Sequence, residues 1–148
     1  MKQLLLILTL LSTKAFGQSK EDSVKQTINR FFEGMRKADS SLIKGSLADG
    51  AFLQTIAKTK EGKMVVRTES LVDFIVAVTK PHTEVYDERI TFETIKTDAD
   101  LASVWTPYQF YVGEKFSHCG VNSFQLARLN GEWKIQYIID TRRKENCK

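Results

Sequence analysis

The sequence predicts an α+β domain in which three helices pack on a curved, mainly antiparallel sheet. Two turn signals predict the sheet, because Gly113-Glu114 and Asn130-Gly131 each stand between strand-like runs, and such pairs favour two-residue hairpins. Apolar residues recur at helical spacing in residues 22–38, which predicts an amphipathic helix. The helical and strand patterns come in runs, and this order favours α+β over repeated βαβ units.

The first seventeen residues have the pattern of a secretory signal peptide. A basic head precedes the mostly apolar run Leu4 to Leu11, and Ala15-Phe16-Gly17 offers the small-x-small step that signal peptidase requires. The apolar run is shorter than the roughly 20 residues that span a bilayer. We therefore expect a periplasmic or secreted protein without a membrane anchor, with one domain over residues 18–148.

Three helices are expected in the first half of that domain. The first covers residues 22–38, with Ser19 as a cap. Asp39-Ser40-Ser41 caps a second, shorter helix that Gly50 ends. Apolar residues at helical spacing predict a third helix from Leu71, ended by Pro81.

Alternating apolar and polar residues predict the strands. In chain order they are residues 51–59, 63–68, 83–96, 103–112, 115–129 and 132–139.

The charge of the chain limits the kinds of partner that we expect. The net charge is +4, or about +2 without the signal peptide, and only Arg142-Arg143-Lys144 form a basic cluster, so we expect no nucleic-acid partner.

Cys119 and Cys147 are the two cysteines. An oxidising compartment favours a disulfide between them, while two free thiols remain an alternative. The two cysteines and the two histidines lack the spacing of a standard metal site. We therefore expect neither a bound metal nor another cofactor.

The two hairpin registers determine which side chains share a face of the sheet. One face combines apolar and polar residues: Trp105, Gln109, Tyr111, Phe116, His118, Asn122, Phe124, Leu126, Trp133, Ile135, Tyr137 and Ile139. It is the more apolar face, so we expect the helices to cover it. Tyr86 and Glu88 of the preceding strand are expected to point toward the same interior.

Buried polar side chains need partners. Those on this face either bond to one another in a filled core or line a cavity, and we predict a small-molecule pocket. The predicted ligand contacts are Tyr86, Trp105, Gln109, His118, Asn122 and Tyr137.

The opposite face is expected to carry a second apolar patch. Its predicted members are Val104, Thr106, Tyr108, Phe110, Val121 and Ile138, among Ser123, Gln125, Lys134, Gln136, Asp140 and Arg142. Exposed apolar patches often form protein interfaces, and we predict a homodimer through this outer face.

Several motifs in residues 103–147 resemble those of a known superfamily. They are Trp105-x-Pro107-Tyr108-x-Phe110, Ser117-His118-Cys119-Gly120, Phe124-x-Leu126, Gly131-x-Trp133-Lys134-Ile135 and Asp140-Thr141-Arg142-Arg143. They look like exported bacterial members of the NTF2-like superfamily, of the SnoaL-like or lumazine-binding kind. The resemblance implies a cone-shaped domain with a pocket between sheet and helices, commonly in a dimer. It implies no single function, because the same cone serves enzymes, transport adaptors and binding modules.

Three functions follow as hypotheses. The first is non-catalytic binding of a small, partly aromatic ligand in the cone. The second is a cofactor-independent isomerase, cyclase or dehydratase with His118 as general base and Glu88 as its orienting group or as the acid. The third is a dimeric structural or partner-binding module.

Overall fold

The computed structural model describes residues 19–147, and the predicted signal peptide lies outside this range. In chain order the elements are α1 (Lys20–Arg36), α2 (Ser40–Ser46), β1 (Leu47–Lys58), β2 (Met64–Glu69), α3 (Leu71–Thr79), β3 (Tyr86–Ile90), β4 (Thr94–Asp98), β5 (Leu101–Val112), β6 (Lys115–Leu129) and β7 (Glu132–Thr141). The predicted α+β class is confirmed. Over these residues no helix combines the length and the apolar character needed to cross a membrane.

A polar side chain caps the first turn of each helix. Ser19 accepts a hydrogen bond from the Asp22 N–H, Asp39 from those of Ser41 and Leu42, and Ser70 from that of Asp73. The second helix ends at Ser46, earlier than predicted. Gly50, predicted to stop that helix, lies instead inside β1 with a positive φ of 74°, next to the irregularity in the β1–β7 pairing.

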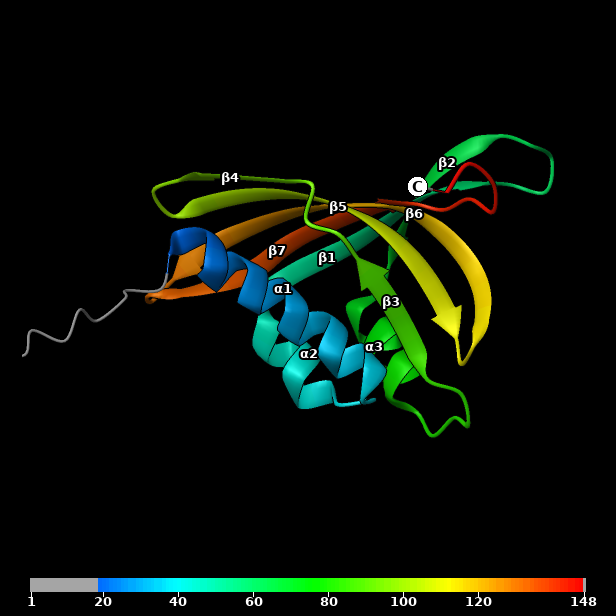
Figure 1. Ribbon diagram of the computed structural model, residues 1–148, viewed down its shortest axis with the longest axis horizontal. Coiled ribbons are helices and arrows are strands. Elements are labelled where there is room, and N and C mark those ends of the chain that lie inside the picture. The colour runs from blue at the N-terminus through cyan, green and yellow to red at the C-terminus, as the bar shows by residue number, and fades with distance from the viewer. Residues whose placement is uncertain (1–18, 148) are drawn as a thin grey trace, which may run out of the picture.

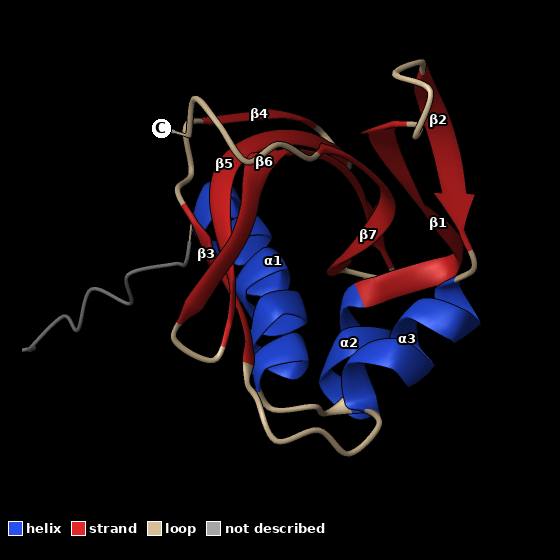
Figure 2. Cartoon of the chain, turned by 90° about the vertical axis from the view of Figure 1, so that its right-hand side faces the viewer, coloured by secondary structure: helices blue, strands red, loops and turns tan. Residues whose placement is uncertain are grey.

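The strands form one sheet in the order β2-β1-β7-β6-β5-β3, and β4 pairs with the first half of β5. All pairs are antiparallel except β1 with β7, which is parallel. The three helices lie on one side of the sheet (Figure 1), and the sheet curls around α1 (Figure 2). We call the side that faces the helices the inner face and the opposite side the outer face.

The predicted strand over residues 83–96 is divided into β3 and β4. Between them, the N–H groups of Thr91 and Glu93 donate to the carbonyls of Pro107 and Trp105 on β5. Pro107 has no N–H with which to complete the ladder on this side. The interruption in the edge strand is therefore explained by the proline opposite it.

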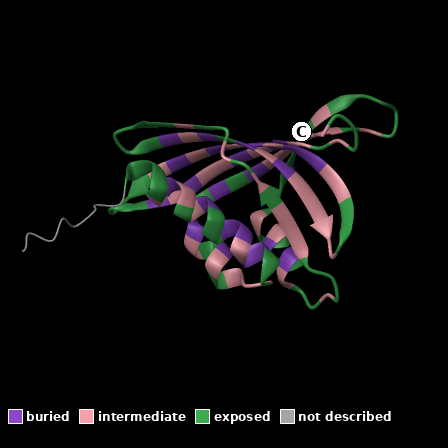
Figure 3. Cartoon of the chain, viewed as in Figure 1, coloured by how far each residue is buried: buried purple, intermediate pink, exposed green. Residues whose placement is uncertain are grey.

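The core lies between α1 and the middle of the sheet, as the buried residues in Figure 3 show. Val24, Ile28 and Phe32 of α1 pack in the same cluster as Phe124 of β6. The Phe32 and Phe124 rings meet edge to face at 6.0 Å, a favoured geometry for aromatic pairs.

Both predicted hairpin turns are confirmed. Val112 pairs with Lys115 and Leu129 with Glu132, and positive φ angles occur at Gly113, Asn130 and Gly131. Away from each turn, however, the register shifts by one residue. Ser117 is the extra residue in β6, because Tyr111 pairs with Phe116 while Phe110 pairs with His118.

Gln136 is the extra residue in β7, since Leu126 pairs with Ile135 while Gln125 pairs with Tyr137. Each β-bulge reverses which side chains face the helices beyond it. The face prediction is therefore wrong for Trp105, Gln109, Tyr111, Phe116, Tyr137 and Ile139, which lie on the outer face. It is equally wrong for Val104, Thr106, Tyr108, Phe110, Ile138 and Asp140, which lie on the inner face.

Candidate functional site

A row of polar side chains crosses the inner face beneath α1. Thr106, Asn122 and Asp140 are directly opposite one another on β5, β6 and β7, and all three are buried. The Asn122 amide donates to Glu88 Oε1 on β3 at 2.8 Å and to Thr106 Oγ1 at 3.5 Å. Four different strands thus bring their polar groups together.

Tyr108 connects this row to the end of β7. Its hydroxyl donates to Asp140 Oδ2 at 3.2 Å and to the Thr141 carbonyl at 2.9 Å, although β6 separates β5 from β7. Gly120, opposite Tyr108 on β6, leaves room for this bridge. A Cβ atom at Gly120 would lie 2.8 Å from the Tyr108 ring and would overlap the Thr141 carbonyl.

Asp140 has one satisfied and one unsatisfied oxygen. Oδ2 accepts from Tyr108 and from Arg142 Nε, the latter at 2.9 Å. Oδ1 is buried and has no hydrogen-bond partner among the described residues. Such atoms are rare in folded proteins, so Oδ1 is a ready acceptor for a bound molecule or water.

Burial shifts the ionisation of the groups around Asp140. It raises the pKa of Glu88 to about 7, with a further increase from Asp140 and an opposing effect of the Asn122 hydrogen bond. Burial and the charge of Asp140 also raise the pKa of Tyr108. Burial and the nearby Arg142 charge lower the pKa of His118. Near neutral pH, Glu88 is therefore divided between its acid and carboxylate forms, while Tyr108 and His118 favour their neutral forms.

A small cavity of about 50 Å³ opens beside these groups. Its polar wall includes Glu88, Asn122 and Asp140, and its apolar wall includes Phe31 and Phe74. The two phenylalanine rings stack at 5.8 Å. Among residues 19–147, no group of three or more His, Cys, Asp or Glu side chains is placed to hold a metal ion.

The structure brings only some of the predicted site residues together. Asn122 and Glu88 line the cavity. Tyr86 and His118 also face inward, but they lie on either side of Phe110, at ring distances of 6.0 and 5.0 Å. Their ligand-binding role stays a prediction.

The predicted pairing of His118 with Glu88 is not formed. Glu88 and His118 both lie opposite Phe110, on different sides of β5, so that strand separates them. His118 Nδ1 is 3.1 Å from Ser117 Oγ, whereas the Glu88 carboxyl bonds to Asn122.

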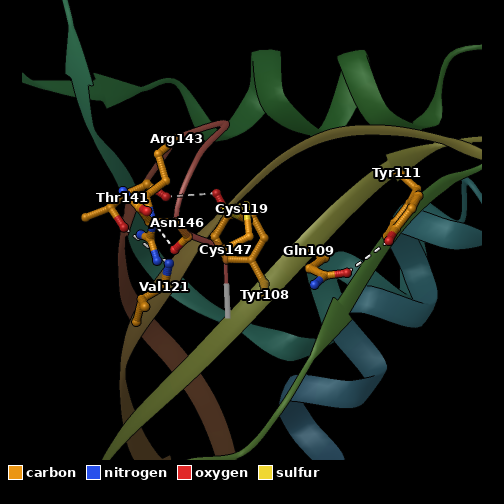
Figure 4. Close-up of a disulfide and its surroundings, with 9 residues drawn as sticks. All are labelled: Tyr108, Gln109, Tyr111, Cys119, Val121, Thr141, Arg143, Asn146 and Cys147. Carbon is orange, nitrogen blue, oxygen red and sulfur yellow. Dashed lines mark hydrogen bonds between the residues drawn. A yellow bond between two sulfur atoms is a disulfide. The ribbon is translucent and has the colours of Figure 1, made fainter.

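The other three predicted contacts lie on the outer face, away from the cavity. Trp105 is 46% exposed, and Gln109 accepts a hydrogen bond from the Tyr111 hydroxyl (Figure 4). Tyr137 stacks on Phe52 at 4.5 Å and donates to Gln54.

The sequence prediction missed Asp140 and Arg142 as site residues, and it placed Tyr108 on the outer face. The spacing of large apolar residues in β7 contains a signal for the shift, since Trp133 and Ile135 are two positions apart and Ile135 and Ile138 are three. Such a change of spacing is the pattern that a bulge produces in a strand.

A disulfide between Cys119 and Cys147 closes the C-terminal tail onto the outer face (Figure 4). Cys119 and Arg143 exchange two backbone hydrogen bonds of 2.9 Å, and the Val121 N–H donates to Thr141 Oγ1. The tail therefore holds Thr141, whose carbonyl also receives the Tyr108 hydroxyl. The alternative of two free thiols does not hold in this structure.

The chain matches no protein-family model and no curated protein. Many solved structures do resemble it. A conserved protein from Planctomyces limnophilus is 18% identical, with a TM-score of 0.68 over 83% of this chain and 95% of that one. An NTF2-like protein of unknown function from Shewanella baltica is 13% identical, with a TM-score of 0.64 over 85% and 95%.

A third similar structure is a candidate dehydratase of the NTF2-like family from Streptomyces avermitilis. It is 15% identical, with a TM-score of 0.63 over 82% of this chain and 94% of that one. Identities this low establish the shared architecture and leave activity open. The cone that the sequence resemblance implied is thereby confirmed, and this chain has the NTF2-like fold.

Proposed function

We propose that the protein binds a small polar molecule, or the polar end of a larger one, in the cavity between α1, α3 and the inner face. The observation that carries the proposal is the buried, unpartnered Oδ1 of Asp140. A bound hydrogen-bond donor would satisfy this oxygen. In a filled core without a ligand the oxygen would stay unpaired, at a cost of about 1–3 kcal/mol.

The walls of the cavity define the chemistry of the ligand. Asp140 accepts hydrogen bonds, and Glu88 accepts as a carboxylate or donates as an acid. Phe31 and Phe74 offer an apolar surface on the other side. A small hydrogen-bond donor group joined to an apolar part fits this combination, and a cavity of about 50 Å³ has room for only the polar end of a larger molecule.

Native mass spectrometry of protein purified from its own host tests the proposal, with extraction and identification of any bound molecule. We expect a bound small molecule in the wild type and its loss in Asn122→Leu. Gln125→Leu is the matched control, because Gln125 lies on the same strand but bonds to Ser103 on the outer face. An empty wild-type protein, or equal retention by both variants, would contradict the proposal.

A second candidate function is proton transfer on the bound molecule, as in a cofactor-independent isomerase or dehydratase. Glu88 favours it, because burial brings the pKa of its carboxyl to about 7, close to the value that suits a general base at neutral pH. Glu88 therefore replaces His118 as the candidate base. Asn122 would position the Glu88 carboxyl, and Tyr108 would support Asp140.

Solvent deuterium incorporation into the bound molecule tests this function. The rate is expected to rise with pH through about 7, as Glu88 loses its proton. Glu88→Gln should abolish the exchange, and Glu93→Gln, in the exposed segment after β3, should leave it unchanged. Exchange that persists in Glu88→Gln would exclude Glu88 as the base.

We propose further that two copies pair through the outer face, although with other residues than the sequence predicted. Trp105, Phe52 and Phe116 are 46%, 42% and 39% exposed on this face, and aromatic side chains are enriched at protein interfaces. Analytical ultracentrifugation is expected to show a dimer at micromolar concentration and a monomer for Trp105→Glu. A monomeric wild type would exclude the pairing.

Export also stays a proposal. The Cys119–Cys147 disulfide supports it, since structural disulfides persist in oxidising compartments. Cell fractionation with a C-terminal tag would place the mature chain in the periplasm or medium, and retention in the cytoplasm would contradict export.

A further inference from the structure

A second hollow lies apart from the cavity and shares no lining residue with it. It is a groove of about 400 Å³ between the first three turns of α1, the end of α2 and the turn that joins β6 to β7. Its charged lining consists of Lys20, Arg30, Arg128, Lys134 and one acid, Glu132. We call it the basic groove.

Two cations of the basic groove lie close to Gly45 at the end of α2. The Arg30 guanidinium lies over Gly45, where a Cβ atom would come within 2.9 Å of Nη2. Lys134 Nζ donates to the Gly45 carbonyl at 2.7 Å and pairs with Glu132 at 2.8 Å. Each of these cations has several N–H groups, so both retain donors beyond these contacts.

Arg128 approaches from the opposite wall. Its Nε donates to the Gly131 carbonyl at 3.3 Å, and this bond anchors the guanidinium at the turn. Two guanidinium groups and a partly buried ammonium, whose side chain is 23% exposed, thus surround one hollow. Guanidinium groups match the geometry of phosphate and carboxylate oxygens.

The positive charge is concentrated here rather than spread over the surface. Without Lys2, Lys14 and Lys148, the remaining residues contain 19 basic and 18 acidic side chains. The groove contains four cations and one carboxylate, which is a larger excess of positive charge than the overall composition would give. A concave site with one sign of charge concentrates ligands of the opposite sign.

We propose that the basic groove binds a small phosphate-bearing molecule, such as a phosphate ester or a diphosphate. The polar lining and the volume suit a compact, multiply charged ligand. This site is independent of the function proposed for the inner cavity.

Trp133 provides a direct reporter, because it lines the groove while Trp105 lies on the outer face. In a Trp105→Phe background, pyrophosphate is titrated at constant ionic strength while Trp133 fluorescence is followed, and isothermal titration calorimetry measures the same binding. We expect saturable binding below 1 mM with either method, and citrate at least tenfold weaker than pyrophosphate.

Charge reversal locates the site. Arg30→Glu and Arg128→Glu are each expected to weaken pyrophosphate binding at least tenfold. Arg67→Glu, on the exposed surface of β2, is the matched control and should change it less than twofold. Circular dichroism checks folding, and Arg128, exposed beside a hairpin turn, provides a test even if Arg30→Glu fails to fold.

Absence of saturation by 10 mM pyrophosphate would overturn the proposal. Equal weakening by Arg67→Glu would also overturn it, since the effect would then reflect overall charge. Citrate binding as tight as pyrophosphate binding would overturn the assignment to phosphate.

Discussion

The two faces of the sheet have unexpected compositions. The inner face, covered by helices, holds the polar groups Glu88, Asn122 and Asp140, whereas the outer face presents the large aromatic ring of Trp105 and the stacked rings of Phe52 and Tyr137. The difference teaches that aromatic rings, which occur on both faces, do not by themselves identify the side that the helices cover. Roughly half of any protein surface is apolar, so buried polar groups are more informative than exposed rings.

The difference between the faces should first appear in core packing. Phe124 on the inner face is fully buried, and Trp105 on the outer face is 46% exposed. We expect Phe124→Ala to lower the free energy of unfolding by about 3–5 kcal/mol, and Trp105→Ala by less than about 1 kcal/mol. Urea denaturation followed by circular dichroism at submicromolar concentration measures both. Similar losses would mean that the faces are assigned incorrectly.

Cys119 is the exception on the outer face, because the C-terminal tail covers it and leaves it 1% exposed. The disulfide to Cys147 spans 28 residues, and a loop of this length is worth about 3.5 kcal/mol in the chain-entropy model. We expect Cys147→Ser to lose about this much in thermal or chemical unfolding. Reductant should lower the stability of the wild type and leave that of the variant unchanged; an equal response of both would contradict the assignment.

The inner face should also give the protein a distinctive pH dependence. The pKa of Glu88 is raised to about 7 in the folded protein, above its unfolded value near 4.5, so the folded state holds the proton more tightly. The stabilisation that this group contributes is at most about 3 kcal/mol. It is complete below about pH 4.5 and is lost as the pH rises toward 7.

Melting temperatures between pH 4.5 and 8 test this expectation by comparison with Glu88→Gln. The wild type should lose stability relative to the variant as pH rises. Glu93→Gln should follow the wild type, because Glu93 is exposed. A constant difference across this range would show that Glu88 titrates normally.

The smallest contrast concerns two tyrosine hydroxyls. Tyr108 bonds to the buried Asp140 and to Thr141 on the inner side, and Tyr137 bonds to Gln54 on the outer side. We expect Tyr108→Phe to cost about 2 kcal/mol and Tyr137→Phe less than about 1 kcal/mol, because only the first change strips a hydrogen bond from a buried carboxylate. Denaturant titrations of the two variants measure both losses of stability, and a larger loss for Tyr137→Phe would contradict this expectation.

Much of the fold was predictable because its signals are local. The caps at Ser19 and Asp39 satisfy N–H groups within the next three residues, and the turns at Gly113 and Asn130-Gly131 require positive φ that these residues accept readily. The inward direction of Glu88 and Asn122 was also correct. These features depend on neighbours in the chain and leave a pattern in the sequence.

The assembled site was less predictable, because two extra residues, Ser117 and Gln136, reverse the faces of long strands. With period-two strands, a shift of one position moves every later side chain to the opposite face. The site therefore lacks Trp105, Gln109 and Tyr137, which were predicted to line it. It contains Tyr108 and Asp140 instead.

The sequence by itself determined the positions of the three helices and of the two tight turns, since each depends on short-range sterics and hydrogen bonds. Only the tertiary structure decided which face the helices cover, the closure of the Cys119–Cys147 disulfide and the meeting of Glu88, Asn122 and Asp140. The physical reason is that a bulge is selected by packing against α1 and neighbouring strands, whose contacts lie far away along the chain.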